Sequence, residues 1–129
     1  MDAAAVRSAA ARIAGRVHRT PVLTSATLDG RTGARVAVKN EAVQKTGSFK
    51  VRGALNRLLT LPEEALDRGL VAVSAGNHAG ALAWAAAQVG AKATVVMPTG
   101  APAAKVAACW GYGAEVVLHG ETTGEAFAE

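Results

Sequence analysis

The chain has 129 residues and a formal net charge of +4 at pH 7, which is enough material for about one domain. Half of its residues are hydrophobic but only 4% are aromatic, so a core must be built mainly from Ala, Val and Leu. The basic residues are scattered and are not interleaved with aromatic residues, a composition that argues against nucleic-acid binding.

Cellular location is indicated by what the sequence lacks. No apolar run is long enough to cross a bilayer, and the first residues lack the apolar centre of a signal peptide. The single cysteine, Cys109, cannot form an internal disulfide and suits a reducing compartment. We therefore expect a cytoplasmic protein that binds neither nucleic acid nor membrane.

The first third of the chain mixes one helix with extended segments. Residues 2–16 predict an amphipathic helix, and Thr20-Pro21 starts an extended segment because a residue before proline avoids helical geometry. Turn residues from Gly30 to Gly33 precede an alternating strand, Arg35–Lys39. His18 stands alone beside a turn, where a structural role is the expected one.

A lysine opens the next predicted helix. Ser48 is a suitable N-cap, and Lys50 lies in the first turn, near unpaired N–H groups with partial positive charge. That placement favours the neutral amine, the form that attacks a carbonyl group. The apolar stripe of this helix consists of Val51, Ala54, Leu55, Leu58 and Leu59.

Beyond this helix the chain alternates between strands and helices. Thr60 to Glu63 has the form of a capping box for a short helix that Gly69 ends. Three apolar runs predict buried strands, at Leu70–Val73, Ala93–Met97 and Glu115–Leu118. A helical segment follows each of them, at Asn77–Val89, from Pro102 to about Trp110, and at Glu121–Glu129. This order predicts an α/β domain whose parallel strands carry ligand loops at their carboxyl ends.

Two segments resemble motifs of one enzyme family. Ser48–Ala54 reads S-F-K-x-R-G-A, and Ser74–His78 reads S-x-G-N-H. Both resemble fold-type II pyridoxal-phosphate (PLP) enzymes, most closely the serine/threonine dehydratase and serine racemase branch. The K-x-E-x-x-Q pattern of Lys39, Glu41 and Gln44 also resembles that family, although Lys39 and Glu41 are interpreted as a solvated strand end without a catalytic role. The resemblance extends from about His18 to the C-terminus.

The resemblance implies a fold and a domain division. The fold would be an α/β, three-layer parallel sheet with helices on both faces, an incomplete version of the tryptophan synthase β-like PLP-dependent fold. Residues 1–47 would belong to the large PLP domain, and residues 48–129 would form most of the small α/β domain.

It also implies a cofactor site for pyridoxal 5'-phosphate and no metal site. Lys50 would form the imine with the cofactor and later remove the Cα proton, and Phe49 would lie against the ring. Asn77 would hydrogen-bond the ring hydroxyl. The substrate carboxylate would bind to the loop formed by Ser74, Ala75, Gly76, Asn77 and His78, with His78 contributing its backbone N–H.

The implied activity is the conversion of L-threonine or L-serine to a 2-oxo acid and ammonia. Ala75 stands where racemases of the family carry a second serine, which disfavours racemisation. A PLP-dependent β-replacement enzyme or threonine synthase of the same fold is the alternative within the family. A non-catalytic remnant or interaction module is the alternative from another class.

Chain length sets an expectation about completeness. Fold-type II enzymes are more than twice as long, and they bind the cofactor phosphate with a downstream glycine-rich loop. No two glycines are consecutive in this chain. We therefore expect an N-terminal fragment that is inactive alone. Its expected partners are a small amino-acid substrate and either a second copy of the chain or a complementing C-terminal part.

Overall fold

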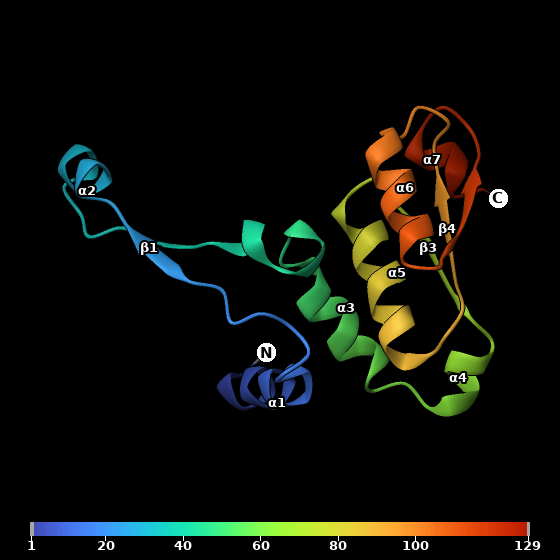
Figure 1. The fold of residues 1–129 in the computed structure, drawn as a ribbon, viewed down its shortest axis with the longest axis horizontal. Helices are drawn as coiled ribbons and strands as arrows, with labels where there is room; N and C mark the ends of the chain where they lie inside the picture. The colour runs from blue at the N-terminus through green and yellow to red at the C-terminus, as the bar shows by residue number, and fades with distance from the viewer. Residues whose placement is uncertain (1, 129) are drawn as a thin grey trace.

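The computed structural model describes residues 2–128. In chain order its elements are α1 (Ala3–Ile13), β1 (Val22–Thr24), α2 (Ala26–Thr32), β2 (Ala37–Lys39), the 3-10 turns Glu41–Val43 and Lys45–Gly47, α3 (Lys50–Leu58), α4 (Glu63–Asp67), β3 (Leu70–Val73), α5 (Asn77–Val89), β4 (Ala93–Met97), α6 (Ala103–Gly111), β5 (Glu115–Leu118) and α7 (Thr123–Ala126). Figure 1 shows two regions, which we call the arm (residues 17–47, with β1, α2 and β2) and the body (residues 48–128). Helix α1 lies beside α3.

The body is built on a three-stranded parallel sheet with the order β3-β4-β5. Leu70 of β3 pairs with Ala93 of β4, and Thr94 of β4 pairs with Glu115 of β5. The three strands have the bounds predicted from their apolar runs, so the expected α/β class with a parallel sheet is confirmed.

The main core lies between this sheet and the helices α3, α5 and α6. Alternate residues of β4 point into it, and Val95 and Met97 are fully buried there together with Leu55 of α3. Helix α5 contributes mostly alanines, whose small side chains let it approach both neighbouring helices closely. An apolar core with few aromatic residues is the one that the composition predicts.

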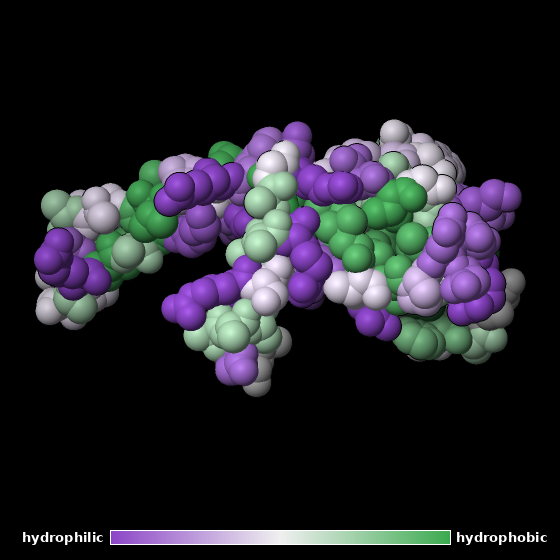
Figure 2. Space-filling view, turned by 90° about the horizontal axis from the view of Figure 1, so that it is seen from below, coloured by the Kyte–Doolittle hydropathy of each residue, from purple (hydrophilic) through white to green (hydrophobic). Residues whose placement is uncertain are grey.

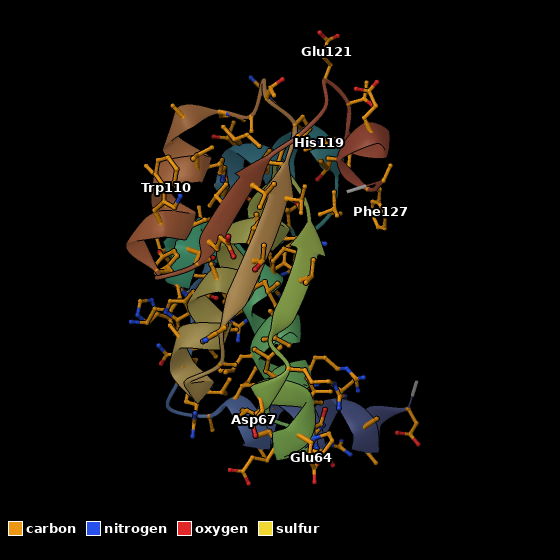
Figure 3. All side chains as sticks on the ribbon, turned by 90° about the vertical axis from the view of Figure 1, so that its right-hand side faces the viewer. Glu64, Asp67, Trp110, His119, Glu121 and Phe127 are labelled. Atoms are coloured by element: carbon orange, nitrogen blue, oxygen red, sulfur yellow. The ribbon has the colours of Figure 1, made fainter. Side chains whose placement is uncertain are left out.

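The opposite face of the sheet is covered only in part. Val96 points to this side, and it is buried, as is Ala126 of α7, although neither belongs to the main core. Figure 3 views the sheet face on, with α7 and the exposed Phe127 beside one end of it. Val71 of β3, on the same face, is 72% exposed. The sheet therefore has helices on both sides, but its second layer is thin.

The arm is a two-stranded antiparallel sheet in which Val22 pairs with Lys39. Its apolar side chains are not buried: Val22 is 59% exposed and Leu23 is 49% exposed. Figure 2 shows the resulting hydrophobic surface on the arm. Gly33, at φ 68°, ends α2 in the left-handed conformation that favours glycine.

Four local predictions need correction. Gly30 lies inside α2, so the turn predicted to begin there is wrong and begins only at Gly33. The first helix is shorter than residues 2–16, and only Ile13 is buried in it. The capping box at Thr60 does not form, because Pro62 occupies the N-cap of α4 and the Thr60 hydroxyl donates to the Arg57 carbonyl instead. The last helix is confined to Thr123–Ala126, and the predicted end at Glu129 lies outside the described residues.

A membrane-spanning helix needs about 20 consecutive apolar residues, and the longest helix of residues 2–128, α5, has 13 residues. Of the helices in residues 2–128, none has the length and hydropathy of a membrane-spanning segment.

Candidate active site

The loop from Ser74 to His78 lies where the sequence predicts a ligand loop, between the carboxyl end of β3 and the start of α5. The Ser74 amide donates to the Val96 carbonyl at 3.1 Å and extends the sheet ladder by one residue. The Ser74 hydroxyl then accepts from the Gly76 amide at 3.1 Å, which turns the chain into the helix. No side chain caps α5, and the Ala79 amide donates to the Gly76 carbonyl at 3.2 Å, which leaves the Asn77 and His78 N–H groups to bind a carboxylate.

Lys50 is the first residue of α3, so it lies in the first helical turn, as predicted. Phe49 occupies the N-cap, so the assignment of Ser48 to that position is wrong. The Ser48 hydroxyl still accepts from the Lys50 amide, at 3.4 Å, and Ser48 is buried. The ammonium of Lys50 lies 5.3 Å from the centre of the Phe49 ring, which is 58% exposed. An amine and an aromatic face are thus presented together at the surface.

Two neighbouring pockets bring the two motifs together. The first, of about 340 Å³, is lined by Lys50 and Phe49 and by His78 of α5. The second, of about 310 Å³, is lined by Gly76 and Asn77 together with Thr46, Gly47, Gly80, Lys105, Ala108 and Tyr112. Segments 27 residues apart in the sequence therefore share one edge of the body. That Lys50 and Asn77 approach one another across one cleft, within the span of a pyridoxal ring, stays a prediction.

A strained turn holds the lysine segment against α5. Thr46 has φ 59° and ψ 11°, a left-handed conformation that is unfavourable for a β-branched residue, and Gly47 follows at φ 70°. The Thr46 hydroxyl is buried and has no hydrogen-bond partner among residues 2–128. Such a conformation costs on the order of 1–3 kcal/mol and persists only where the surrounding structure imposes it.

Arg52 and Glu41 join the arm to the body. The Arg52 guanidinium donates to both carboxylate oxygens of Glu41, from Nη2 at 2.8 Å and from Nε at 2.9 Å. The Thr20 hydroxyl donates to Glu41 Oε1 at 2.5 Å. The Arg52 hydrogen bonds, with that of Thr20, hold the pKa of Glu41 at about 2. Glu41 is thus a structural clamp, and its interpretation as a solvated strand end is wrong.

Neighbouring residues complete this clamp through the backbone. The side-chain amide of Gln44 donates to the His18 carbonyl at 2.8 Å and accepts from the His18 amide at 2.9 Å. The Lys39 ammonium donates to the Thr20 carbonyl at 2.6 Å. The His18 ring makes a 3.0 Å contact with the Val43 carbonyl, in keeping with the structural role expected for it.

Lys105 is a site residue that the sequence analysis did not identify. It belongs to the first turn of α6, and its ammonium donates to Asn77 Oδ1 at 2.5 Å. The signal available in the sequence was topological. In a parallel sheet with the order β3-β4-β5, the helices after β3 and β4 lie side by side, and α5 and α6 do so here.

The side chains present fit the chemistry that pyridoxal phosphate requires. Lys50 supplies an amine, Phe49 an apolar ring face and Asn77 an amide, and the uncapped start of α5 supplies backbone donors for an anion. No group in this arrangement conflicts with an aldehyde-bearing aromatic cofactor.

Comparisons with known proteins agree with this chemistry. The profile of the family described as "Pyridoxal-phosphate dependent enzyme" matches residues 13–129. The L-threo-3-hydroxyaspartate ammonia-lyase of Pseudomonas sp is 53% identical over 92% of this chain and 37% of that protein. The catabolic L-threonine dehydratase of Escherichia coli K12 is 44% identical over 92% of this chain and 36% of that protein.

A solved structure of a related protein has a closely similar fold. The serine racemase of maize superposes with a TM-score of 0.92 and 40% sequence identity, over 98% of this chain and 39% of that one. The chain thus spans a little over a third of the length of the relatives that it matches.

Proposed function

The chain belongs to the pyridoxal-phosphate dependent enzyme family, and from this premise we propose that it carries the catalytic lysine of an ammonia-lyase acting on L-threonine or L-serine. The products would be a 2-oxo acid and ammonia. The observation that carries the proposal is one pocket that is lined both by Lys50 of α3 and by His78, at the start of α5 after β3. We place the reaction in the cytoplasm, as the composition suggests.

The cofactor of this family, when bound, holds the substrate through its amino group and draws electrons from Cα into the pyridine ring. The residues of this chain would do the rest. The Lys50 amine would hold the cofactor and then take the Cα proton. Phe49 would cover part of one ring face and exclude water, and Asn77 would donate to the ring hydroxyl.

The loop from Ser74 to His78 would orient the substrate. A carboxylate at the start of α5 would accept from the free N–H groups of Asn77 and His78, and the Ser74 hydroxyl could add a further donor. Ala75 offers no side-chain acid or base there. This is why we favour elimination over racemisation, although both activities occur among the names of the relatives.

A second substrate is favoured by one specific finding. The relative with 53% identity is named as an L-threo-3-hydroxyaspartate ammonia-lyase, so a β-hydroxy amino acid with an acidic side chain is a candidate beside threonine and serine. The same chemistry serves all three, because each substrate loses its β-hydroxyl as water. A β-replacement enzyme, a threonine synthase or a non-catalytic interaction module remains the alternative.

Chemical trapping tests the role of Lys50. The chain is incubated with pyridoxal phosphate and treated with borohydride, which reduces any imine to a stable pyridoxyl-lysine, and the modified peptide is located by mass spectrometry. We expect modification mainly at Lys50, absent in Lys50→Ala. Equal modification of Lys39, Lys45, Lys92 and Lys105 would overturn the proposal.

Turnover tests the expected inactivity of the chain alone. We expect no 2-oxo acid from threonine, serine or 3-hydroxyaspartate, because no glycine-rich phosphate loop is present in the sequence. We propose that a complementing C-terminal part supplies the missing loop, and that a second copy of the chain, which lacks the loop as well, is an oligomeric partner only. Release of 2-oxobutyrate from threonine by the chain alone, abolished in Lys50→Ala, would contradict this.

A further inference from the structure

The contact between Lys105 and Asn77 links two helices at the edge of the site. Lys105 lies in the first turn of α6 and Asn77 is the first residue of α5. Lys105 Nζ donates to Asn77 Oδ1 at 2.5 Å, and the hydrogen bond is charge-assisted because its donor is a cation. Both residues line the same pocket, together with Gly76 and Gly80.

The direction of this hydrogen bond fixes the orientation of the asparagine amide. A lysine ammonium has three donors and no acceptor, so only the carbonyl oxygen of Asn77 can face it. The Nδ2 group must then point to the other side. Within the described chain, Nδ2 donates to no acceptor, so it is a free donor held in a defined direction.

No carboxylate of the described residues neutralises the positive charge of Lys105. Its ammonium forms no ion pair with any carboxylate in residues 2–128. Its nearest polar partner is therefore the Asn77 amide. A donor that is itself polarised by a cation donates more strongly, because hydrogen bonds in a chain reinforce one another.

From these observations we propose that Lys105 is a positioning residue, which locks the Asn77 amide so that Nδ2 donates to the ring hydroxyl of the cofactor. The inference rests on the proposed function of the site. Lys105 acts through Asn77 and does not itself touch the cofactor. By polarising the Asn77 amide, it also favours the ionised form of that hydroxyl.

The first test needs no cofactor. In the ¹⁵N spectrum of the chain, the side-chain amide signal of Asn77 should shift in Lys105→Met and return toward its original position in Lys105→Arg. The amide of Asn40, which lies in the arm, serves as the internal reference. Lys92→Met is the matched control, because it removes one lysine charge away from this pocket and should leave the Asn77 signal unchanged.

The second test measures cofactor binding. Removing a hydrogen bond that involves a charged group should raise the Kd for pyridoxal phosphate by about tenfold or more in Lys105→Met. The long-wavelength absorbance band of the bound cofactor should weaken relative to the short-wavelength band, since the ring hydroxyl is less often ionised. Lys105→Arg should restore the band, and Lys92→Met should change neither quantity.

A double-mutant comparison separates positioning from a direct role. If Lys105 acts through Asn77, then Lys105→Met should have little further effect on Kd in an Asn77→Ala background. An undiminished effect in that background would overturn the positioning role. So would an unchanged amide signal, Kd and absorbance in the single variant Lys105→Met.

Trapping with borohydride distinguishes a failure of the proposed function from a failure of the role proposed for Lys105. Failure to modify Lys50 in the unaltered chain would overturn the proposed function, and the role of Lys105 toward the cofactor with it. Modification mainly at Lys105 would overturn the positioning role in another way, because it would make Lys105 the reacting amine. Normal trapping at Lys50 with no effect of Lys105→Met would overturn the positioning role alone.

Discussion

The arm and the body use the same kinds of apolar residue with opposite outcomes. Val95 in the body is fully buried between the sheet and its helices, whereas Val22 and Leu23 in the arm are about half exposed. The strands are short in both regions, with three residues each in the arm and four or five in the body. The difference is the layer above the strands: helices cover the main core face of the body, and nothing in the described chain covers the strands of the arm. Strand-forming residues become a stable sheet only where a second layer buries them.

The largest expected effect is in hydrogen exchange. Amides of β4 should open only with the whole body, while those of Arg35–Lys39 should open locally, because an isolated two-stranded ribbon is marginally stable. With a global stability of at least ~5 kcal/mol, the protection should differ by roughly a thousandfold or more. Exchange followed by NMR measures it. Equal protection of Arg35–Lys39 and Ala93–Met97 would show that the arm is self-sufficient.

Two leucine substitutions, one in each region, compare what the body and the arm contribute to the free energy of unfolding. Leu55→Ala empties a fully buried site in the body and should lower the free energy of unfolding by about 2–5 kcal/mol. Leu23→Ala, its counterpart in the arm, should change it by less than about 0.5 kcal/mol. Urea titration of both variants is the measurement. A large loss from Leu23→Ala would mean that another copy of the chain buries the arm in solution.

A smaller effect is expected where the arm and the body are joined. The folded-state pKa of Glu41, about 2, lies below the ordinary value of 4.5, so unfolding takes up a proton between these values. The contribution of Glu41 to stability is therefore fully present above pH 4.5 and is lost as the pH falls through about 2. Allowing for solvent screening, it should amount to about 1–2 kcal/mol.

The Arg52 Nε–H signal in NMR reports this clamp directly. We expect it to keep its position down to about pH 3 and to change with a midpoint near pH 2. In Glu41→Gln the same signal should show no such transition. A midpoint near 4.5 in the unaltered chain would mean that the ion pair does not form in solution.

The sequence predicted the body well because its signals are local and agree with one another. Ala93–Met97 is an apolar run interrupted only by Thr94, and Gly90 and Pro98 flank the segment; the structure gives the strand those bounds. The loop from Ser74 to His78 was placed at the correct strand end for the same reason. Pattern and propensity both point to one structure in such segments.

The arm and the details of the site were harder to predict because tertiary contacts decide them. Gly30 indicates a turn by composition, yet Ser25 caps α2 and the Asp29 carboxylate accepts from the Val36 amide at 2.7 Å. The clamp between Glu41 and Arg52 and the contact of Lys105 with Asn77 depend on how separate elements pack. No local pattern records either of them.

The pairing of Val22 with Lys39 in the arm has a consequence for how the two regions fold. It closes a slightly shorter loop than the pairing of Leu70 with Ala93 in the body. Because the entropy of closing a loop varies only with the logarithm of its length, the two closures differ by roughly 0.3 kcal/mol. The strands of the arm thus meet as readily as those of the body. What the arm lacks is apolar surface to bury after they have met.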